Sequence, residues 1–285
     1  MNRTSRRLAA SSALALVALA AIACGSPPLP KANSITYVAN SGFLIWAGEK
    51  KVLVDALFDK FRGYPGAPTL VRDGKAPFDD IDLVLATHRD WDHFSASAVS
   101  RCLKSNPRAA FVAPADAARQ VTGFDGRVYP VEVAEGQRRH LAVNGIGIDA
   151  MLLPHAGVLL PHAGVAPVNL GYLITIGNRK FFHTGDISAE VATAAYMKPF
   201  NLPAEHIDVA FVPHYFLSTQ APLRLVTESI QPRVVFASHV QGRRLLGLVS
   251  GILYSNDKPP NAGQIKRNFP SAVVPRTGLE SWPIR

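Results

Sequence analysis

An apolar stretch that ends in a run of histidines and aspartates constrains this chain more than any other feature. Residues 81–86 read Ile-Asp-Leu-Val-Leu-Ala, which favours a buried strand, and residues 87–94 follow at once as Thr-His-Arg-Asp-Trp-Asp-His-Phe. Four potential metal ligands therefore lie within six residues: His88, Asp90, Asp92 and His93. On a tight turn the first two can face one cation and the last two a second, and two cations about 3.5–4 Å apart can clamp a bond to be cleaved.

Three more potential ligands stand where later apolar runs end. They are His155 after residues 148–154, Asp186 at the end of Phe-Phe-His-Thr-Gly-Asp, and His239 after residues 234–238. A buried strand gives the side chain at its end little freedom, and functional residues in layered α/β folds collect at such ends. The simpler alternative is a polar loop in which His88 caps a strand and Asp92 caps a helix from Ser95. The complete series favours a metal centre over that loop.

This ordered series resembles the metallo-β-lactamase superfamily of metal-dependent hydrolases, whose first motif is His-x-His-x-Asp-His. Residues 87–93 match the motif except that Asp90 replaces its second histidine. The resemblance starts at residue 35 and extends at least to His239. Within the superfamily, the stretch from Asn169 to Asp186 is most similar to the branch that contains ascorbate-6-phosphate lactonase and the phospholipase D acting on N-acyl ethanolamine lipids.

The resemblance implies an α/β (α+β) fold, a four-layered αββα sandwich, for a hydrolase domain at residues 34–285. The pattern along the chain agrees with this fold. We expect hairpins at 34–55 and at 170–183, the latter turning on Gly177 and Asn178, strands near 81–86, 109–113, 127–133, 146–153, 207–213 and 233–238, and helices near 95–105, 115–122, 188–198, 220–230, 241–254 and 262–268.

The resemblance also implies two ligand sets for two divalent ions, with zinc expected. His88, Asp90 and His155 would hold one ion, and Asp92, His93 and His239 the other, with Asp186 bridging the two. The carboxylate of Asp90 is a harder ligand than imidazole. It would favour iron or manganese at the first position, or leave only the second position filled.

A tandem duplication complicates one ligand. The heptad Leu-Leu-Pro-His-Ala-Gly-Val occupies residues 152–158 and recurs at 159–165. His155 directly follows the apolar run, so we expect it to be the ligand. His162 would then lie in the following loop, at the rim of the site or facing solvent, and a shifted register would exchange the two.

Two further histidines have weaker claims on the site. His183 precedes Asp186 by three residues, and we expect it to orient that carboxylate rather than bind metal. His214 ends another apolar run, where it suits a proton donor, a substrate contact or a structural histidine. The aromatic side chains that could wall the pocket, with core packing as the alternative, are Phe61, Tyr64, Trp91 and Tyr215.

These features predict a hydrolase in which a metal-bound hydroxide attacks an ester, a lactone or a phosphodiester, with Asp92 and His214 in the catalytic set. Asp90 also leaves open a degenerate metal-binding or ligand-binding lipoprotein on the same scaffold. A nuclease and a β-lactamase are weaker alternatives. We expect a small-molecule or lipid-like substrate and no nucleic acid, because no basic run with interleaved aromatics is present.

The N-terminus reads as a bacterial export signal over residues 1–23, with basic residues followed by a short apolar stretch. Loss of Arg3, Arg6 and Arg7 would lower the formal net charge from +9 to about +6. Cys24 follows small residues in a pattern that resembles a lipobox, and cleavage without lipid attachment is the alternative. Residues 24–33 would form a Pro-rich spacer, which predicts a periplasmic or cell-envelope protein tethered to a membrane.

Overall fold

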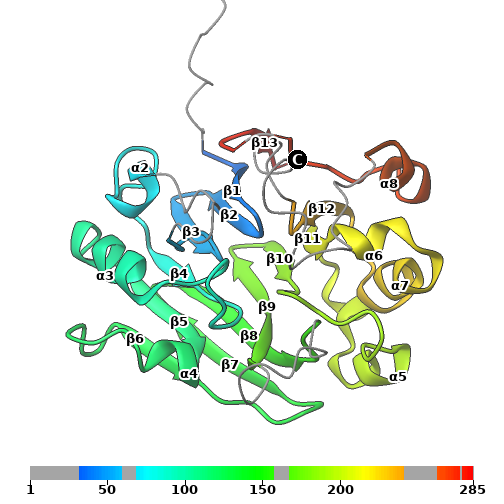
Figure 1. The fold of residues 1–285 in the computed structure, drawn as a ribbon, viewed down its shortest axis with the longest axis horizontal. Coiled ribbons are helices and arrows are strands. Elements are labelled where there is room, and N and C mark those ends of the chain that lie inside the picture. The colour runs from blue at the N-terminus through cyan, green and yellow to red at the C-terminus, as the bar shows by residue number, and fades with distance from the viewer. Residues whose placement is uncertain (1–31, 60–68, 157–166, 241–261, 277, 285) are drawn as a thin grey trace, which may run out of the picture.

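The computed structural model describes residues 32–59, 69–156, 167–240, 262–276 and 278–284. Within these residues the chain forms two β-sheets packed face to face (Figure 1). The first sheet has the order β13-β1-β2-β3-β4-β5-β6, with β1 Ser34–Ala39, β2 Gly42–Ala47, β3 Lys50–Val54, β4 Leu83–Leu85, β5 Ala110–Pro114, β6 Val128–Val131 and β13 Ser281–Pro283. The second has the order β12-β11-β10-β9-β8-β7, with β7 Arg138–Val143, β8 Ile146–Leu153, β9 Asn169–Ile176, β10 Arg179–His183, β11 Val209–Pro213 and β12 Val234–Ser238.

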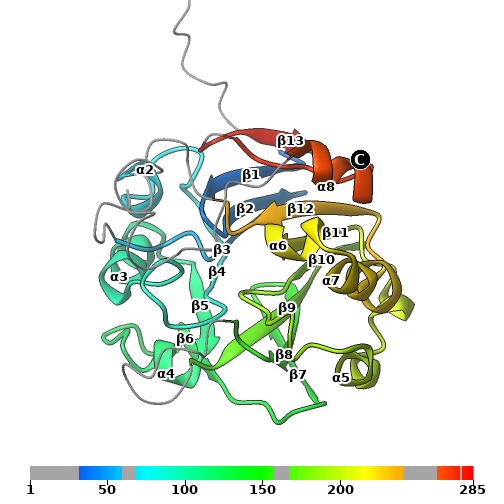
Figure 2. The ribbon, with the colours of Figure 1, turned by 45° about the vertical axis from the view of Figure 1, so that its right-hand side comes forward.

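Helices cover the outer face of each sheet, which gives the expected αββα order of layers (Figures 1 and 2). The first sheet is covered by α2 Thr69–Arg72, α3 Ala96–Ser105 and α4 Ala115–Ala118. The second is covered by α5 Ala194–Met197, the short 3₁₀ turns η1 Lys198–Phe200 and η2 Leu202–Glu205, α6 His214–Ser218, α7 Gln220–Arg224, the π-helical turn η3 Leu225–Ile230, and α8 Ala262–Asn268. Among the described residues, no helix has the length and apolar character needed to cross a membrane.

Strand alternation explains why the first sheet is apolar on both faces. Phe43 and Ile45 of β2 pack between the two sheets, while Leu44 packs against the helices outside. In β4, Leu85 faces the inner core and Val84 the outer one. Because both faces are covered, these strands read as continuous apolar runs rather than as an alternating pattern.

The structure departs from the sequence expectations at a few elements. β7 and β13 were not predicted, because each lies at the edge of its sheet and β7 begins with two arginines and a histidine. The helix expected at 188–198 is confined to α5, which begins only after Thr193 caps it by accepting a hydrogen bond from the Tyr196 amide. The expected helix at 115–122 ends at Ala118, and the one at 241–254 lies outside the described residues.

The arrangement of strands gathers the functional residues at one edge. Strands β3 to β6 run parallel to one another, as do β10 to β12 in the facing sheet. Asp55, the turn 87–94, Asp186, His214 and His239 all follow the carboxyl ends of these strands. Parallel strands therefore bring together residues that are as much as 184 positions apart in sequence.

An aromatic cluster joins the two sheets below that edge. The ring centroid of Phe43 in β2 lies 4.5 Å from that of Phe211 in β11 and 6.1 Å from that of Phe236 in β12. Phe43 is fully buried. Aromatic pairs at these separations add to the stabilisation that burial alone gives.

Replacing Phe43 by alanine should therefore destabilise the fold. We expect F43A to lower the free energy of unfolding by about 3–5 kcal/mol, as deletion of a buried phenylalanine does. Urea unfolding followed by circular dichroism measures the change. V191A, at an exposed valine, is the control. A loss below about 1 kcal/mol in F43A would contradict the packing described.

Candidate metal centre

The turn after β4 is fixed by a buried carboxylate on the neighbouring strand. Asp55, directly after β3, accepts hydrogen bonds from the Thr87 amide at 2.7 Å and from the Thr87 hydroxyl at 2.7 Å. Two further bonds close the turn, because the amides of His93 and Phe94 both donate to the Asp90 carbonyl. The backbone that carries the predicted ligands is therefore held before any ligand binds.

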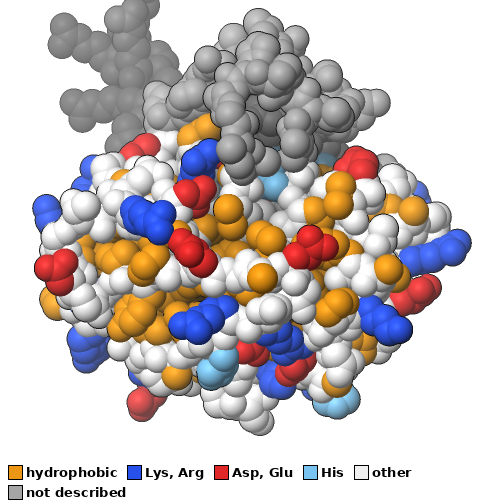
Figure 3. Space-filling view, turned by 90° about the horizontal axis from the view of Figure 1, so that it is seen from below, with side chains coloured by type: hydrophobic (Ala, Val, Ile, Leu, Met, Phe, Trp, Pro, Cys, Tyr) orange, Lys and Arg blue, Asp and Glu red, His pale blue; other side chains and the backbone are white. Residues whose placement is uncertain are grey.

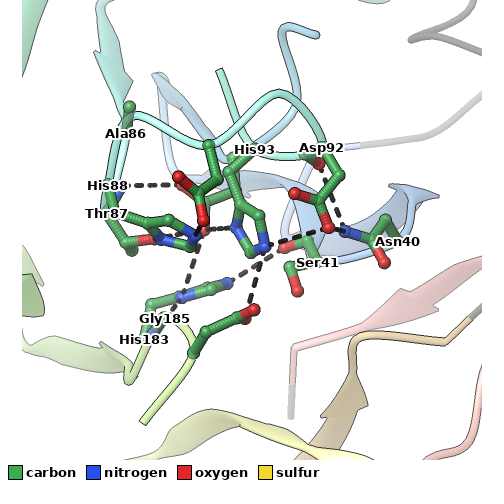
Figure 4. Close-up of polar contacts among 12 residues, drawn as sticks. Asn40, Ser41, Ala86, Thr87, His88, Asp92, His93, His183 and Gly185 are labelled. Carbon is green, nitrogen blue, oxygen red and sulfur yellow. Dashed lines mark hydrogen bonds and ion pairs between the residues drawn. The ribbon is translucent and has the colours of Figure 1, made fainter. Parts of the chain in front are cut away.

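The structure brings the predicted ligands together in two groups. His88, His155 and Asp186 offer atoms that all lie within 4.8 Å of one another, and the same holds for Asp92, His93 and His239. Asp186 also lies against the second group, with its two oxygens 3.3 Å from His93 Nε2 and 3.2 Å from His239 Nε2. Its carboxylate is thus placed between the groups, where a bridging ligand would stand. Figure 4 shows one ligand of the first group, His88, beside two of the second, Asp92 and His93.

Asp90 lies beside the first group. Its Oδ2 is 3.9 Å from His88 Nε2 and 3.8 Å from His155 Nε2, although 40% of its side chain is exposed. Ligand atoms bound to one ion at about 2.0–2.2 Å stand at most a little over 4 Å apart. These separations are compatible with a single ion that Asp90 shares with both histidines.

Buried nitrogen and oxygen atoms without a hydrogen-bond partner among the described residues indicate that the site fits a metal. Nε2 of His88 and Nε2 of His155 are buried, and neither has a hydrogen-bond partner among the described residues. His93 Nε2 and Asp186 Oδ1 lie close together but without the alignment of a hydrogen bond. Buried polar atoms nearly always have partners, and imidazole with carboxylate is a donor set that divalent transition metals accept.

Hydrogen bonds at Nδ1 of His88 and of His93 determine that Nε2 is the nitrogen available to bind a metal. His93 Nδ1 lies 2.8 Å from Asp55 Oδ2, so it donates a proton to that carboxylate. Thr87 gives its hydroxyl proton to Asp55, so its oxygen accepts from His88 Nδ1 at 2.9 Å. Both rings then direct Nε2 toward the site, which is how metal-binding histidines are usually oriented.

Asp55 is one of the site residues that the sequence did not reveal. It is fully buried and serves Thr87 and His93 at once. The available signal was an acidic residue that directly ends the apolar strand β3. A buried carboxylate of this kind needs partners, and the two residues that supply them flank the metal motif.

His183 has both ring nitrogens engaged. Nδ1 accepts from the Gly185 amide at 3.0 Å, and Nε2 donates to the Ser41 carbonyl at 3.0 Å. Burial lowers the pKa of this imidazole, which agrees with the neutral form that such bonding requires. His183 therefore holds the turn before Asp186, as expected, and leaves no nitrogen for a metal.

Asn169 supports the same turn from β9. Its side chain accepts from the Asp186 amide at 3.2 Å and donates to the Thr184 carbonyl at 3.1 Å. Gly185 has a φ of +57°, and a β-carbon there would come within 2.1 Å of Asn169 Oδ1. Only glycine fits beneath this amide, so the Gly-Asp pair is a steric requirement of the turn.

Charges within the centre balance one another. Burial alone would raise the pKa of Asp186, but His239 and His93 beside it hold that pKa well below its usual range. Burial would lower the pKa of His93 and of His239, but the carboxylates around them raise both. His88 has no such excess of anions, and burial together with His93 keeps its pKa well below the usual value.

The remaining predicted residues are placed as follows. His214 begins α6 and is buried, and burial together with the nearby His239 lowers its pKa to about 4. Trp91 is half-buried on the metal turn. Tyr215 is half-buried and donates to the Ile187 carbonyl at 2.9 Å, just after Asp186. The other candidates, Cys24, Phe61, Tyr64 and His162, lie outside the described residues.

Comparison with known proteins agrees with this geometry. Residues 50–246 match the family described as the β-lactamase superfamily domain. Among curated proteins, the chain is 26% identical over 221 residues to N-acyl-phosphatidylethanolamine-hydrolyzing phospholipase D 1 of Caenorhabditis elegans. The match covers 67% of this chain and 61% of that protein, so the chain spans less than two thirds of the relative's length.

Solved structures share the fold at low sequence identity. Igni18, a metallo hydrolase from the archaeon Ignicoccus hospitalis, has a TM-score of 0.58 and 19% identity, with 88% of this chain and 99% of that one covered. CmlA, a diiron β-hydroxylase from Streptomyces venezuelae, has a TM-score of 0.57 and 16% identity, with 90% and 55% covered. Because the family match extends through the metal turn, Asp186 and His239, the chain belongs to the β-lactamase superfamily.

Proposed function

We propose that this hydrolase cleaves a phosphodiester in a lipid-like substrate at a centre of two divalent ions. The observation that carries the proposal is the convergence of two ligand groups on the edge shared by both sheets, with buried Nε2 atoms that lack partners among the described residues. His88, Asp90 and His155 would hold one ion, and Asp92, His93 and His239 the other. Asp186 would contact both.

The side chains have distinct roles in this proposal. Ions held there supply Lewis acidity and lower the pKa of bound water. Asp92 lies at the centre with its side chain about one eighth exposed, so it can accept a proton from water that reaches the site. His214, whose pKa is lowered to about 4, is neutral at pH 7 and can donate a hydrogen bond to a substrate oxygen. This favours a substrate contact over the proton-donor role.

The substrate class rests on the phospholipase D relative. The name of that relative describes hydrolysis of an N-acyl phosphatidylethanolamine, a lipid with a phosphodiester. Esters and lactones stay open as alternatives, because one centre of this kind can polarise a carbonyl or a phosphoryl oxygen. Nucleic acid is disfavoured, since basic and acidic side chains are interspersed on the face shown in Figure 3 and form no continuous basic tract there.

The export signal and lipid attachment at Cys24 stay predictions, since residues 1–31 lie outside the described residues. They are compatible with the proposed substrate. An enzyme tethered to a membrane leaflet would meet a lipid substrate at high local concentration.

Asp90 bears on the identity of the metal. With a carboxylate at this position, each ligand set consists of two imidazoles and one carboxylate, and Asp186 adds a further oxygen to both. Hard oxygen ligands shift preference from zinc toward iron or manganese. We therefore propose that the first position, at least, prefers one of these two metals.

Metal content and turnover test the function together. Purified protein should hold about two equivalents of metal and hydrolyse bis(p-nitrophenyl) phosphate, while H88A and H239A should each lose about one equivalent and at least about 100-fold in turnover. Elemental mass spectrometry and absorbance measure the two quantities. H140A, at an exposed histidine on β7, is the control.

The outcomes separate the candidate functions. Metal content that is unchanged in both variants would contradict the assigned ligands. Two bound equivalents without turnover on phosphodiester, ester and lactone panels would favour a degenerate binding protein instead. Turnover on a lactone or carboxylic ester alone would retain the centre but change the substrate class.

A change at Asp90 tests the choice of metal. D90H should raise the ratio of zinc to iron and manganese in protein loaded from an equimolar mixture under reducing, anaerobic conditions, because it replaces a hard ligand by imidazole. Elemental mass spectrometry measures the ratio. D80H, at an exposed aspartate, controls for an added surface histidine. An unaltered ratio in D90H would show that Asp90 does not bind metal.

A change at Asp55 tests the support beneath the metal turn. D55N should weaken metal binding about 10–100-fold, because an amide has only one accepting oxygen and cannot serve both the Thr87 amide and the pair formed by the Thr87 hydroxyl and His93 Nδ1. Competition with a chelator measures the affinity. D82N is a matched control, since Asp82 is also buried but bonds Lys50 and Lys51 away from the centre. Equal affinities in the two variants would refute the assigned role.

A further inference from the structure

The turn between β1 and β2 contacts the strand end at His239 across almost 200 residues of sequence. The Ser41 hydroxyl accepts from the His239 amide at 3.1 Å, and the Asn40 carbonyl accepts from the Val240 amide at 3.3 Å. The Tyr37 hydroxyl donates to the Val240 carbonyl at 2.5 Å. Three bonds from one hairpin therefore hold the two residues that follow β12.

His239 needs such support because of its backbone. Its φ is +57°, in the left-handed region that residues with a β-carbon seldom occupy. Strained residues of this kind persist only where the surrounding structure determines them from several sides. Here the hairpin supplies the bond to the His239 amide itself, and β11 holds the preceding residue through the strand register.

The same turn also holds Asp92. Asn40 is buried, and its side-chain amide donates to both the Asp92 carbonyl and Asp92 Oδ2, each at 3.2 Å (Figure 4). Asp92 and His239 belong to the same ligand group, and their facing atoms lie 3.6 Å apart. One turn thus contacts two of the three residues of the second group.

The first group has different support. His88 is fixed by Thr87 and Asp55, and the amide after His155 donates to the Asp186 carbonyl. In the described part of the chain, neither Asn40 nor Ser41 is hydrogen-bonded to His88 or His155. The turn also reaches Asp186 indirectly, since the Ser41 carbonyl accepts from His183, but a change in the Ser41 side chain leaves that carbonyl in place.

We propose that Asn40 and Ser41 are positioning residues for the second metal position: Ser41 fixes the backbone of His239, and Asn40 fixes the carboxylate of Asp92. The inference rests on the proposed metal centre and assigns a separate support to one half of it. Loss of either contact should selectively lower the affinity for the ion at the second position. Loss of a purely structural residue should lower the affinity for neither ion, or for both to a similar degree.

The test titrates Co²⁺ into the full-length protein and follows its absorption spectrum, with His88→Ala and His239→Ala as references for each half. H239A should abolish binding of one of the two Co²⁺ ions. S41A and N40A should weaken the affinity for that same ion by about 10–100-fold and change the affinity for the other ion by less than about threefold. S41T should restore the affinity, because it keeps the hydroxyl. T36V is the matched control, since Thr36 is a buried hydroxyl of the same hairpin that bonds Ser281 instead.

Double variants make the outcome decisive. In H88A, adding S41A should weaken the affinity for the remaining ion by about 10–100-fold, whereas in H239A adding S41A should change the remaining affinity by less than about threefold. The inference would be overturned if S41A lowered the affinity for both ions equally, or if neither S41A nor N40A lowered the affinity for either ion. Wild-type protein that binds no Co²⁺ would instead overturn the proposed metal centre.

Discussion

The buried carboxylate of Asp55 is the interaction on which the centre depends. A fully buried anion is costly unless it is bonded on several sides, and here the partners are the Thr87 amide, the Thr87 hydroxyl and His93 Nδ1. These bonds fix the start of the metal turn relative to β3 and set the tautomer of a proposed ligand. Because the buried acid must be hydrogen-bonded, its bonds fix the positions of Thr87 and His93, at the two ends of the metal turn.

The second sheet supports the same turn from the opposite side. The Tyr172 hydroxyl donates to the Ala86 carbonyl at 3.0 Å, and the Leu170 amide donates to the Thr87 carbonyl at 2.8 Å. The backbone just before His88 is therefore bonded to both sheets. Since the predicted ligands come from both sheets, any sliding of one sheet over the other would disperse the centre, and these cross-sheet bonds oppose it.

The sequence predicted the fold, and it predicted most of the residues that the structure brings together at the candidate centre, because both depend on local patterns. Long apolar runs identified the central strands, and the ligands stood where those runs ended. β7 was not predicted because an edge strand needs only one apolar face. Its two arginines and its histidine interrupt the alternation of apolar and polar residues that identifies a strand. Asp55, Asn40 and Ser41 escaped because their partners are far away in sequence, and no local pattern records such a pairing.

The contact between the first hairpin and His239 bears on when the centre forms during folding. Contacts between residues so far apart form late, because the entropy of closing the long intervening loop must be overcome first. The second ligand group is thus incomplete until nearly the whole domain has assembled. An ion with affinity only for the complete group would stabilise the finished fold by mass action and would leave unfinished chains unoccupied. Metal uptake at the second position would then follow assembly of the domain rather than nucleate it.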